Sequence, residues 1–253
     1  MNPVSAVIIT LNEADNLRKS LPQLSWCDEI IVVDSGSTDN TLDVCKQYHC
    51  VVHEKKFNGY GEQKQFGISL ARNKWILCTD ADEVLTDELV AEMKQEMIQP
   101  TAVAYLVPIT LVFMGTIFKY GKDSRRYFLR LFNKEFGNFN SNVLHEKIEV
   151  TGEKKKMKNI ILHFSYRDID HYFFKFNKFS TLGAKAAFEQ GKRKSLLLTI
   201  LSVPLYFLRY FFIEMNFLNG AGGFYWSMFS AYYHFVKYTK IRELYATEKN
   251  SVR

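Results

Sequence analysis

Short apolar runs alternate with helical patterns over residues 1–100. Residues 6–10 are continuously apolar and rich in β-branched side chains, as expected of a strand buried on both faces. Similar runs recur along the chain, at residues 29–34, 51–53 and 75–80. The intervening segments predict helices, the first with Asn12 as its N-cap, two over 41–48 and 61–72, and the last capped by Thr86. This alternation predicts an α/β fold: a Rossmann-like, mostly parallel sheet with flanking helices.

The regular alternation of strand and helix patterns ends at Pro100. Strands are predicted over 102–107, 127–132 and 160–164, with irregular connections between them. A long aromatic helix is expected from Asp168 to about Gly191, and the basic residues 192–194 then lead into an almost wholly apolar segment, 195–213. We therefore expect one domain over residues 1–165, divided near residue 100, and a separate aromatic-rich helical region over 166–253.

Three of the predicted strands end in polar, acidic segments, at residues 10–13, 34–39 and 80–83. Ligands of such sheets bind beyond the carboxyl ends of the strands, so these segments are expected to form one site. Asp80 and Asp82 directly follow a buried strand and can present oxygens to Mg²⁺ or Mn²⁺, which would also hold substrate phosphates. Alone, the pair would more often be an acidic turn before a helix; the two other acidic strand ends favour a site.

Charge and cysteine content narrow the setting of the protein. The chain has 253 residues and a net charge of +6, which favours an anionic partner such as nucleic acid, anionic lipid or a phosphorylated substrate. Its four cysteines contain no C-x-x-C pair, which indicates free thiols in a reducing compartment. With no secretory signal pattern at the N-terminus, these features predict a cytoplasmic location.

Three ordered motifs resemble the family 2 glycosyltransferases, which have the GT-A fold. They are the segments 7–13 (VIITLNE), 31–41 (IVVDSGSTDNT) and 80–83 (DADE). The variant Asp-Ser-Gly-Ser-Thr-Asp, with Gly61-x-Gln63-Lys64, is similar to the bacterial branch that adds glucose to the inner core of lipopolysaccharide. Segments 129–132 and 144–146 also resemble that branch. The resemblance implies a GT-A catalytic domain over 1–165, with a nucleotide-sugar half over 1–100 and an acceptor half over 101–165.

The resemblance also implies roles for residues on the nucleotide side of the site. Thr10, Asn12 and Glu13 would line the nucleotide pocket, and Asp34 would accept hydrogen bonds from the base or ribose. Asp39 belongs to the same motif, although helix capping by this residue or by Ser37 explains its presence equally well.

Further residues are expected to contact the diphosphate and the metal ion. Lys64 would lie near the diphosphate, and Arg130 could meet phosphate or an anionic acceptor. Asp80 would face the ribose and the metal, while Asp82 is the better candidate for a direct metal ligand. His163 is a possible third ligand, against the common alternative of a histidine that only packs in the core.

An inverting enzyme needs a carboxylate base to take the proton of the acceptor hydroxyl. Many relatives use the aspartate of a Glu-Asp pair beyond the D-x-D motif, and no such pair follows residue 100 here. Glu146 stands at about the right place in the chain and is the expected base. The neighbouring His145 could orient it, bind a phosphate, or merely pack.

The apolar segment 195–213 approaches the length of a membrane span. Pro204 and Arg209 count against a true span, so we expect a helix in the plane of the membrane interface, attracted by anionic lipid and anchored by the aromatic residues that follow. A buried core helix and a homodimer interface are the alternatives.

The sequence therefore predicts an inverting, metal-dependent glycosyltransferase, peripheral on the cytosolic face of a bacterial inner membrane. It would move a hexose, glucose from UDP-glucose, onto a lipid-linked saccharide such as lipopolysaccharide core, with no nucleic acid partner. Transfer to a polyprenyl phosphate is the nearest alternative. A sugar nucleotidyltransferase is less favoured because residues 5–15 lack a glycine-rich phosphate loop. A non-catalytic membrane-binding module is the third alternative.

Overall fold

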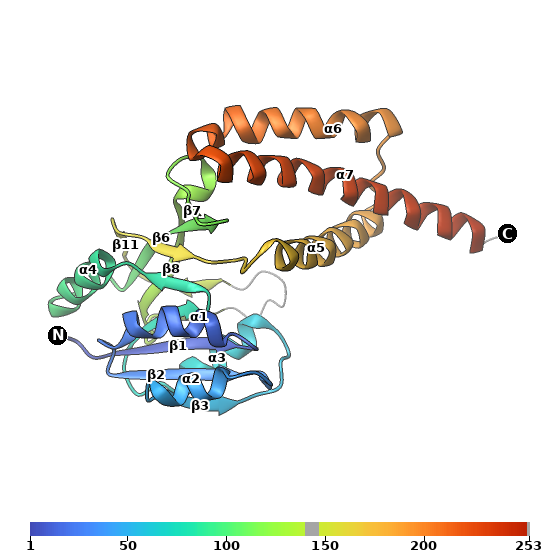
Figure 1. Ribbon diagram of the computed structural model, residues 1–253. Helices are drawn as coiled ribbons and strands as arrows, with labels where there is room; N and C mark the ends of the chain where they lie inside the picture. Colours follow the sequence, from blue (N-terminus) through green and yellow to red (C-terminus); the bar gives the residue numbers. More distant parts are fainter. Residues whose placement is uncertain (140–146, 252–253) are drawn as a thin grey trace. The chain divides into compact units, whose positions relative to one another are not determined.

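The chain folds into two compact units, seen in a computed structural model that describes residues 1–139 and 147–251 (Figure 1). Unit 1 comprises Met1–Thr110 and Arg125–Phe164, and unit 2 comprises Leu111–Ser124 and Ser165–Arg253. Residues 111–124 thus group with the C-terminal helices, which no feature of the sequence indicates. The functional division at residues 100 and 165 stays a prediction.

Unit 1 is built on a mixed β-sheet. The strands on its main path are β1 (Val4–Thr10), β2 (Glu29–Asp34), β3 (Val51–Glu54), β4 (Trp75–Asp80), β5 (Glu83–Leu85), β6 (Ala104–Phe113), β8 (Arg126–Asn133) and β12 (Ile161–His163). Their order across the sheet is β3-β2-β1-β4-β8-β6-β12-β5 (Figure 1). The first four pair in parallel, whereas β8 runs antiparallel to both β4 and β6. The parallel part carries the predicted strand ends at one edge.

Short strands complete unit 1. β11 (Lys154–Lys156) pairs in parallel with β6, and β9 (Gly137–Phe139) forms a separate antiparallel pair with β10 (Ile148–Val150). None of the three was expected from the sequence, because a run of three residues shows no measurable periodicity.

Helices cover both faces of the sheet, as the alternating pattern predicts. They are α1 (Ala14–Ser20), the 3₁₀ turn η1 (Leu21–Leu24), α2 (Thr41–Gln47), α3 (Tyr60–Leu70) and α4 (Asp87–Ile98). Neighbouring residues of β1 show the two faces: Ile8 packs in one cluster with Leu17 and Met93, and Val7 packs in another with Ile68 of α3. The α/β fold with flanking helices is confirmed.

The predicted N-cap of the first helix is wrong. Helix α1 begins at Ala14, Glu13 occupies the cap position without a side-chain hydrogen bond, and Asn12 has a left-handed φ of 56°. Asparagine tolerates this conformation better than most residues. Thr86, by contrast, caps α4 as predicted, because its hydroxyl accepts a hydrogen bond from the amide of Leu89 (3.3 Å).

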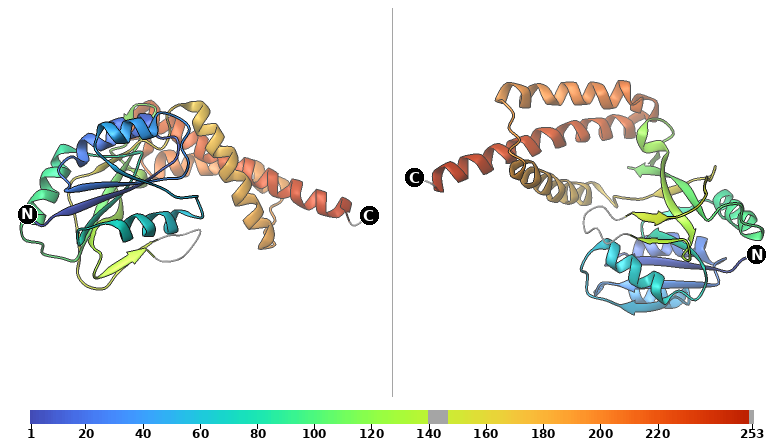
Figure 2. Two further views of the ribbon diagram at one scale, coloured as in Figure 1. Left: turned by 90° about the horizontal axis from the view of Figure 1, so that it is seen from below. Right: turned by 180° about the vertical axis from the view of Figure 1, so that it is seen from behind.

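Unit 2 is largely helical (Figures 1 and 2). Its elements are β7 (Thr116–Ile117), the 3₁₀ turn η2 (Lys122–Ser124), α5 (Ile169–Glu189), α6 (Leu196–Leu208), the π-helical turn η3 (Arg209–Ile213), the 3₁₀ turn η4 (Asn216–Asn219) and α7 (Gly220–Ser251). Helix α5 begins where predicted, since Asp168 Oδ1 accepts a hydrogen bond from the amide of His171 (2.7 Å). Phe113, Tyr172 and Phe176 form an aromatic core with Trp226 of α7. The predicted aromatic-rich helical region is confirmed.

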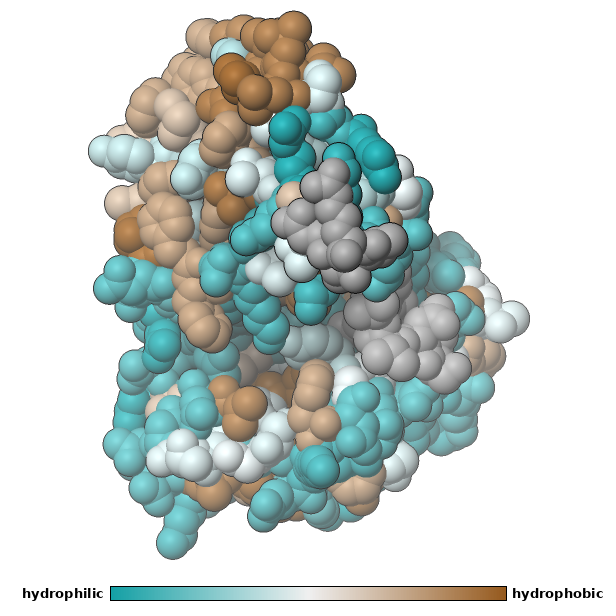
Figure 3. Space-filling model, turned by 90° about the vertical axis from the view of Figure 1, so that its right-hand side faces the viewer, coloured by the Kyte–Doolittle hydropathy of each residue, from teal (hydrophilic) through white to brown (hydrophobic). Residues whose placement is uncertain are grey.

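Helix α6 has the reverse of the usual distribution of polar and apolar side chains. Thr199 and Ser202 are buried, with exposed fractions of 1% and 3%, whereas Leu197 and Leu205 are 66% and 62% exposed. The segment Leu196–Ile213 is long and apolar enough to cross a membrane, by length and composition, and only 11% of it is buried. Figure 3 shows hydrophobic side chains gathered at the top of the view. Such exposure is inconsistent with the alternative of a core helix buried within this chain.

Candidate active site

The acidic strand ends converge, as the sequence predicts. In the parallel register of β1 with its two neighbours, Thr10 is paired with Asp34, and Ile9 with Asp80. The loops that follow β1, β2 and β4 therefore leave the sheet at one edge. This edge is where ligands of doubly wound sheets bind.

Asp34 organises the turn that follows β2. Its buried carboxylate accepts hydrogen bonds from the amides of Gly36 (2.9 Å) and Ser37 (2.8 Å) and from the Ser37 hydroxyl (2.5 Å). Gly36 has a φ of 98°, a conformation that glycine adopts without steric cost. The carboxylate thus shapes the loop, and its hydrogen bond to a base or ribose stays a prediction.

Asn12 and Asp39 tie together the loops after β1 and β2. Asn12 Oδ1 accepts hydrogen bonds from the amides of Thr38 (2.8 Å) and Asp39 (3.3 Å). Asp39 in turn accepts from the hydroxyl and the amide (3.0 Å) of Thr41, which begins α2, and from the amide of Ala14 (3.3 Å), which begins α1. Burial raises the pKa of Asp39, but these hydrogen bonds outweigh burial and hold the pKa below its ordinary value. Asp39 thus accepts hydrogen bonds from the first amides of both helices, although the N-cap position of α2 is Asn40.

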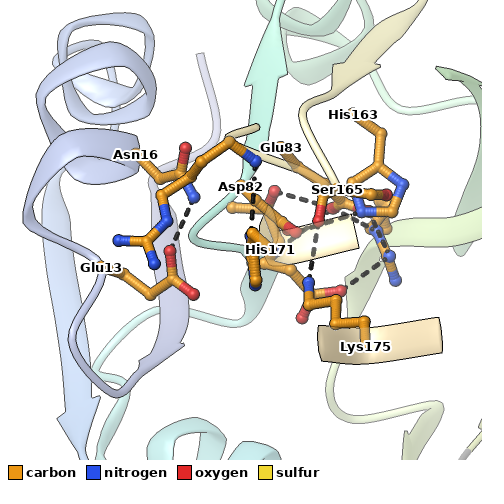
Figure 4. A network of polar contacts seen from close by, with 12 residues as sticks. Glu13, Asn16, Asp82, Glu83, His163, Ser165, His171 and Lys175 are labelled. Atoms are coloured by element: carbon orange, nitrogen blue, oxygen red, sulfur yellow. Dashed lines mark hydrogen bonds and ion pairs between the residues drawn. The ribbon is translucent and has the colours of Figure 1, made fainter. Parts of the chain in front are cut away.

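Two buried polar atoms near these loops have no hydrogen-bond partner among the described residues: Thr10 Oγ1 and Gln63 Oε1. Ser35 lies between them, since its amide donates to the Thr10 carbonyl (3.0 Å) and its hydroxyl accepts from Gln63 Nε2 (2.8 Å). An unsatisfied buried polar atom costs about 1–3 kcal/mol, so a ligand that supplied partners here would gain affinity. Glu13, at the end of the β1 loop, accepts a hydrogen bond from Asn16 Nδ2 (2.6 Å; Figure 4).

Two cations and two carboxylates form a compact network at the end of β4. Lys64 Nζ lies 2.9 Å from Asp80 Oδ1, and Arg130 Nη2 lies 3.3 Å from Asp80 Oδ2. Arg130 also makes a bidentate pair with Glu83, with donor–acceptor distances of 2.9 Å and 2.6 Å. Glu83 Oε2 additionally accepts from the Thr79 hydroxyl (3.0 Å) and the Asp80 amide (3.1 Å). The four charges balance one another.

The electrostatics of this network favour the charged forms of Asp80, Lys64 and Arg130. Burial raises the pKa of Asp80, but Lys64 and Arg130 outweigh burial and hold that pKa well below its ordinary value. Burial lowers the pKa of Lys64, yet Asp80 keeps it above its ordinary value. Burial likewise lowers the pKa of Arg130, and Glu83 and Asp80 more than reverse the effect.

Asp82 lies beside this network and pairs with His163. His163 Nε2 is 3.3 Å from Asp82 Oδ2, and Figure 4 shows both side chains close to Glu83. The backbone sets this proximity, because His163 and Glu83 are partners in the β12–β5 register and the amide of Phe164 donates to the Asp82 carbonyl (2.8 Å). Burial lowers the pKa of His163, but Asp82 outweighs burial and raises it above its ordinary value.

The side chains fit a weakly coordinating hard cation better than a closed metal cage. Among residues 1–139 and 147–251, no group of three or more His, Cys, Asp and Glu is placed to hold a metal ion. Both oxygens of Asp80 are engaged by Lys64 and Arg130, whereas the ion pair of Asp82 is with a histidine. Mg²⁺ is commonly bound by one or two carboxylates plus substrate phosphates. Asp82 offers a carboxylate oxygen for such a cation.

Not every expected site residue can be located. His145 and Glu146 lie outside the described residues. Thr10, Asn12, Asp34 and Asp39 meet at the β1–β2 edge, and Lys64, Asp80, Asp82, Arg130 and His163 meet at the end of β4. Sequence reasoning assigned no role to Glu83 or Gln63. Glu83 gave no signal of its own, because it follows Asp82 in an acidic segment. Only the structure shows that it is buried and that its charge therefore requires a partner.

Comparison with known proteins gives consistent matches. The model of glycosyl transferase family 2 matches residues 5–152. An uncharacterized glycosyltransferase of Rickettsia felis is 33% identical over 270 residues, covering 100% of this chain and 94% of the relative. The lipopolysaccharide core biosynthesis glycosyltransferase LpsC of Rhizobium meliloti is 33% identical over 253 residues, covering 96% of this chain and 93% of the relative.

Among solved structures, S. aureus TarS 1–349 aligns with 97% of this chain and 92% of its own, at 14% identity and a TM-score of 0.45. The sheet order and the helices on both faces of the sheet establish the α/β fold by themselves.

Proposed function

The chain belongs to glycosyl transferase family 2, and we propose that it is an inverting, divalent-cation-dependent hexosyltransferase acting on a lipid-linked saccharide. The donor would be a nucleoside diphosphate hexose, with UDP-glucose the first candidate. The observation that carries this proposal is the convergence of Thr10, Asp34 and Asp80 at one sheet edge, with Asp82 beside them. The similarity to LpsC, a lipopolysaccharide core biosynthesis glycosyltransferase, supports a lipopolysaccharide core saccharide as the acceptor class.

The charge balance of the site supports the use of a metal ion. Lys64 and Arg130 are matched by Asp80 and Glu83, so a diphosphate entering this site must bring a counter-charge of its own. We propose that Asp82 holds Mg²⁺ or Mn²⁺. Asp80 and His163 would join it as ligands only after leaving their ion pairs with Lys64, Arg130 and Asp82. When bound, the cation would neutralise the charge that develops on the leaving diphosphate.

The proposed transfer needs one base and releases one nucleotide. Glu146 would accept the proton of the acceptor hydroxyl while the hydroxyl oxygen bonds to the anomeric carbon of the donor. The bond between that carbon and the diphosphate oxygen breaks, and its electron pair leaves with the nucleoside diphosphate. His145 would orient Glu146. Both assignments rest on the family resemblance and on the place of these residues in the chain.

The exposed apolar surface of α6 supports a location at the membrane. Leucine side chains point outward along this helix while Thr199 and Ser202 are buried, as expected of a helix that lies in a lipid interface. Co-flotation of the intact chain with vesicles tests this proposal. Leu197→Gln/Leu205→Gln should abolish flotation, whereas the control Leu42→Gln/Ile98→Gln, at exposed positions of unit 1, should not. Equal flotation of both double variants would contradict it.

Donor turnover tests the chemistry. The chain is incubated with UDP-glucose, other UDP-hexoses or GDP-mannose, with and without Mg²⁺ or Mn²⁺, and nucleoside diphosphate release is followed. Asp82→Asn should reduce metal-dependent release by on the order of 100-fold. The control Asp87→Asn, at an exposed position in the first turn of α4, should leave it unchanged. Undiminished release by the Asp82 variant would refute the assigned metal ligand.

Two further measurements address the base and the acceptor. Glu146→Gln should abolish transfer, whereas Glu149→Gln, at an exposed position three residues on, should retain it. A product in which the hexose is joined to polyprenyl phosphate, rather than to a saccharide, would replace the proposed acceptor while leaving the donor site intact.

A further inference from the structure

Unit 2 contains a basic cavity of its own, of about 420 Å³. Its walls come from the C-terminal half of α5, the link that precedes α6, and α7. Four of the lining residues are cations and none is an Asp or Glu; the cations are Lys192, Arg193, Lys194 and Lys237. We call this cavity the basic pocket.

The cations of the basic pocket are held by aromatic rings rather than by carboxylates. Lys194 Nζ lies 4.1 Å from the ring centre of Tyr238, and the Arg193 guanidinium lies 4.0 Å from that of Tyr245. Lys237 Nζ is 5.1 Å from the Tyr238 ring. None of the pocket's cations forms an ion pair within the described part of the chain. A ring orients a cation without cancelling its charge, so the pocket keeps a positive potential.

A neighbouring histidine experiences the same field. Burial lowers the pKa of His234, and Lys237 and Lys194 lower it further, to about 4. Burial is the larger cause of this shift, and the two lysines add to it as positive charges near an imidazole do.

Small side chains keep the pocket open. The wall formed by α5 consists mainly of Gly183, Ala186 and Ala187. A Cβ atom on Gly183 would lie 2.9 Å from the Tyr233 hydroxyl, closer than ordinary contact allows. A larger residue at this position would push into the α7 side of the cavity.

The place of the basic pocket along the chain suggests which chemical class of ligand it could meet. Lys194 stands two residues before Leu196, where the exposed apolar helix α6 begins. A helix lying in a membrane interface sits at the boundary between acyl chains and headgroups, so the link before it lies at headgroup level. The groups that carry negative charge at this level are the phosphates of anionic lipids.

We propose that the basic pocket binds the phosphate of an anionic lipid headgroup and thereby adds a specific contact to the apolar contact made by α6. This inference rests on the membrane association proposed above. It assigns that association a lipid preference, which the apolar surface alone would not produce.

Quantitative vesicle binding of the full chain tests the inference. The probes are vesicles of phosphatidylcholine alone and of phosphatidylcholine with a minor fraction of phosphatidylglycerol. Lys194→Gln/Lys237→Gln should weaken binding to the phosphatidylglycerol vesicles by about 30-fold and leave binding to phosphatidylcholine nearly unchanged. The matched control, Lys178→Gln/Lys249→Gln, removes the same charge from exposed positions of α5 and α7 outside the pocket and should have a much smaller effect.

The outcomes distinguish failure of the basic pocket from failure of the proposed membrane association. Equal losses in the two double variants, or no preference for phosphatidylglycerol, would overturn the pocket while leaving membrane association standing. Absence of binding to any vesicle would overturn both. Displacement by inorganic phosphate, beyond that caused by sodium chloride at equal ionic strength, would show that free phosphate is the ligand and would overturn the lipid assignment. Far-UV circular dichroism of each variant checks that the helices remain folded.

Discussion

Arg130 is the residue whose replacement tests the charge network most directly. Its guanidinium makes a bidentate pair with Glu83, whose side chain is almost fully buried, and also contacts Asp80. Arg130→Met keeps most of the side-chain volume but leaves the Glu83 carboxylate in a site without its counter-charge. Removing one partner of a buried pair costs about 3–5 kcal/mol, because the remaining charge is uncompensated. We expect a loss of that size in the free energy of unfolding of unit 1.

A matched variant separates burial from simple loss of an ion pair. Arg18 pairs with Asp15 at 2.8 Å, but both side chains are exposed to solvent. Arg18→Met should therefore cost at most about 1 kcal/mol. A second variant removes the uncompensated charge of Glu83. Glu83→Gln/Arg130→Met should lose less unfolding free energy than Arg130→Met alone, because a neutral amide needs no counter-charge.

Native-state hydrogen exchange provides the assay, since the amides of β1 and β4 report the opening of the sheet in unit 1. Two results would refute the reasoning. One is a loss of unfolding free energy in Arg130→Met no larger than that in Arg18→Met. The other is a loss in the double variant equal to the sum of the losses in Glu83→Gln and Arg130→Met.

Two further predictions concern unit 1. Burial raises the pKa of Glu29, but hydrogen bonds from Ser5 and Arg72 hold it below its ordinary value. At a pH above the ordinary pKa of a glutamate, the ionised form of Glu29 therefore stabilises the fold, and this contribution disappears as the pH falls through the lowered pKa. The difference in unfolding free energy between the native chain and Glu29→Gln, measured by hydrogen exchange, should therefore become smaller in acid. A Cβ on Gly67 would lie 2.5 Å from Val7 Cγ1, so Gly67→Ala should cost about 1–3 kcal/mol, and Val7→Ala in the same chain should recover part of that loss.

The parallel strands could be predicted because their signal is local. Each is a continuous, β-branched run, and the strands observed at Val4–Thr10, Glu29–Asp34 and Trp75–Asp80 match the predicted ranges closely. β11 could not be predicted in the same way. It consists of three exposed lysines, Lys154–Lys156, and is a strand only because β6 lies beside it. Tertiary pairing, not local pattern, decides such a strand.

In the site, too, some residues could be predicted from the local sequence, whereas their partners are set by the pairing of distant strands. Asp80 and Asp82 could be found from their place after a buried strand, but their partners depend on the topology of the sheet. Arg130 reaches Asp80 because β8 is antiparallel to β4, and His163 reaches Asp82 because β12 pairs with β5. Neither pairing has a signature in the spacing of these residues along the chain.

The exposed apolar surface of α6 could be covered by a membrane or by a second copy of the chain. The two partners differ in whether they also account for the cations near this helix. A dimer interface would bury Leu197 and Leu205 but gives no reason for uncompensated cations, including Lys194 and Lys237, near one end of the same helix. A membrane with anionic headgroups accounts for both features with one partner. We therefore expect the chain to sediment as a monomer in a mild detergent and to aggregate or bind vesicles without it. A discrete dimer in detergent that Leu197→Gln/Leu205→Gln converts to monomer would show instead that α6 meets another copy.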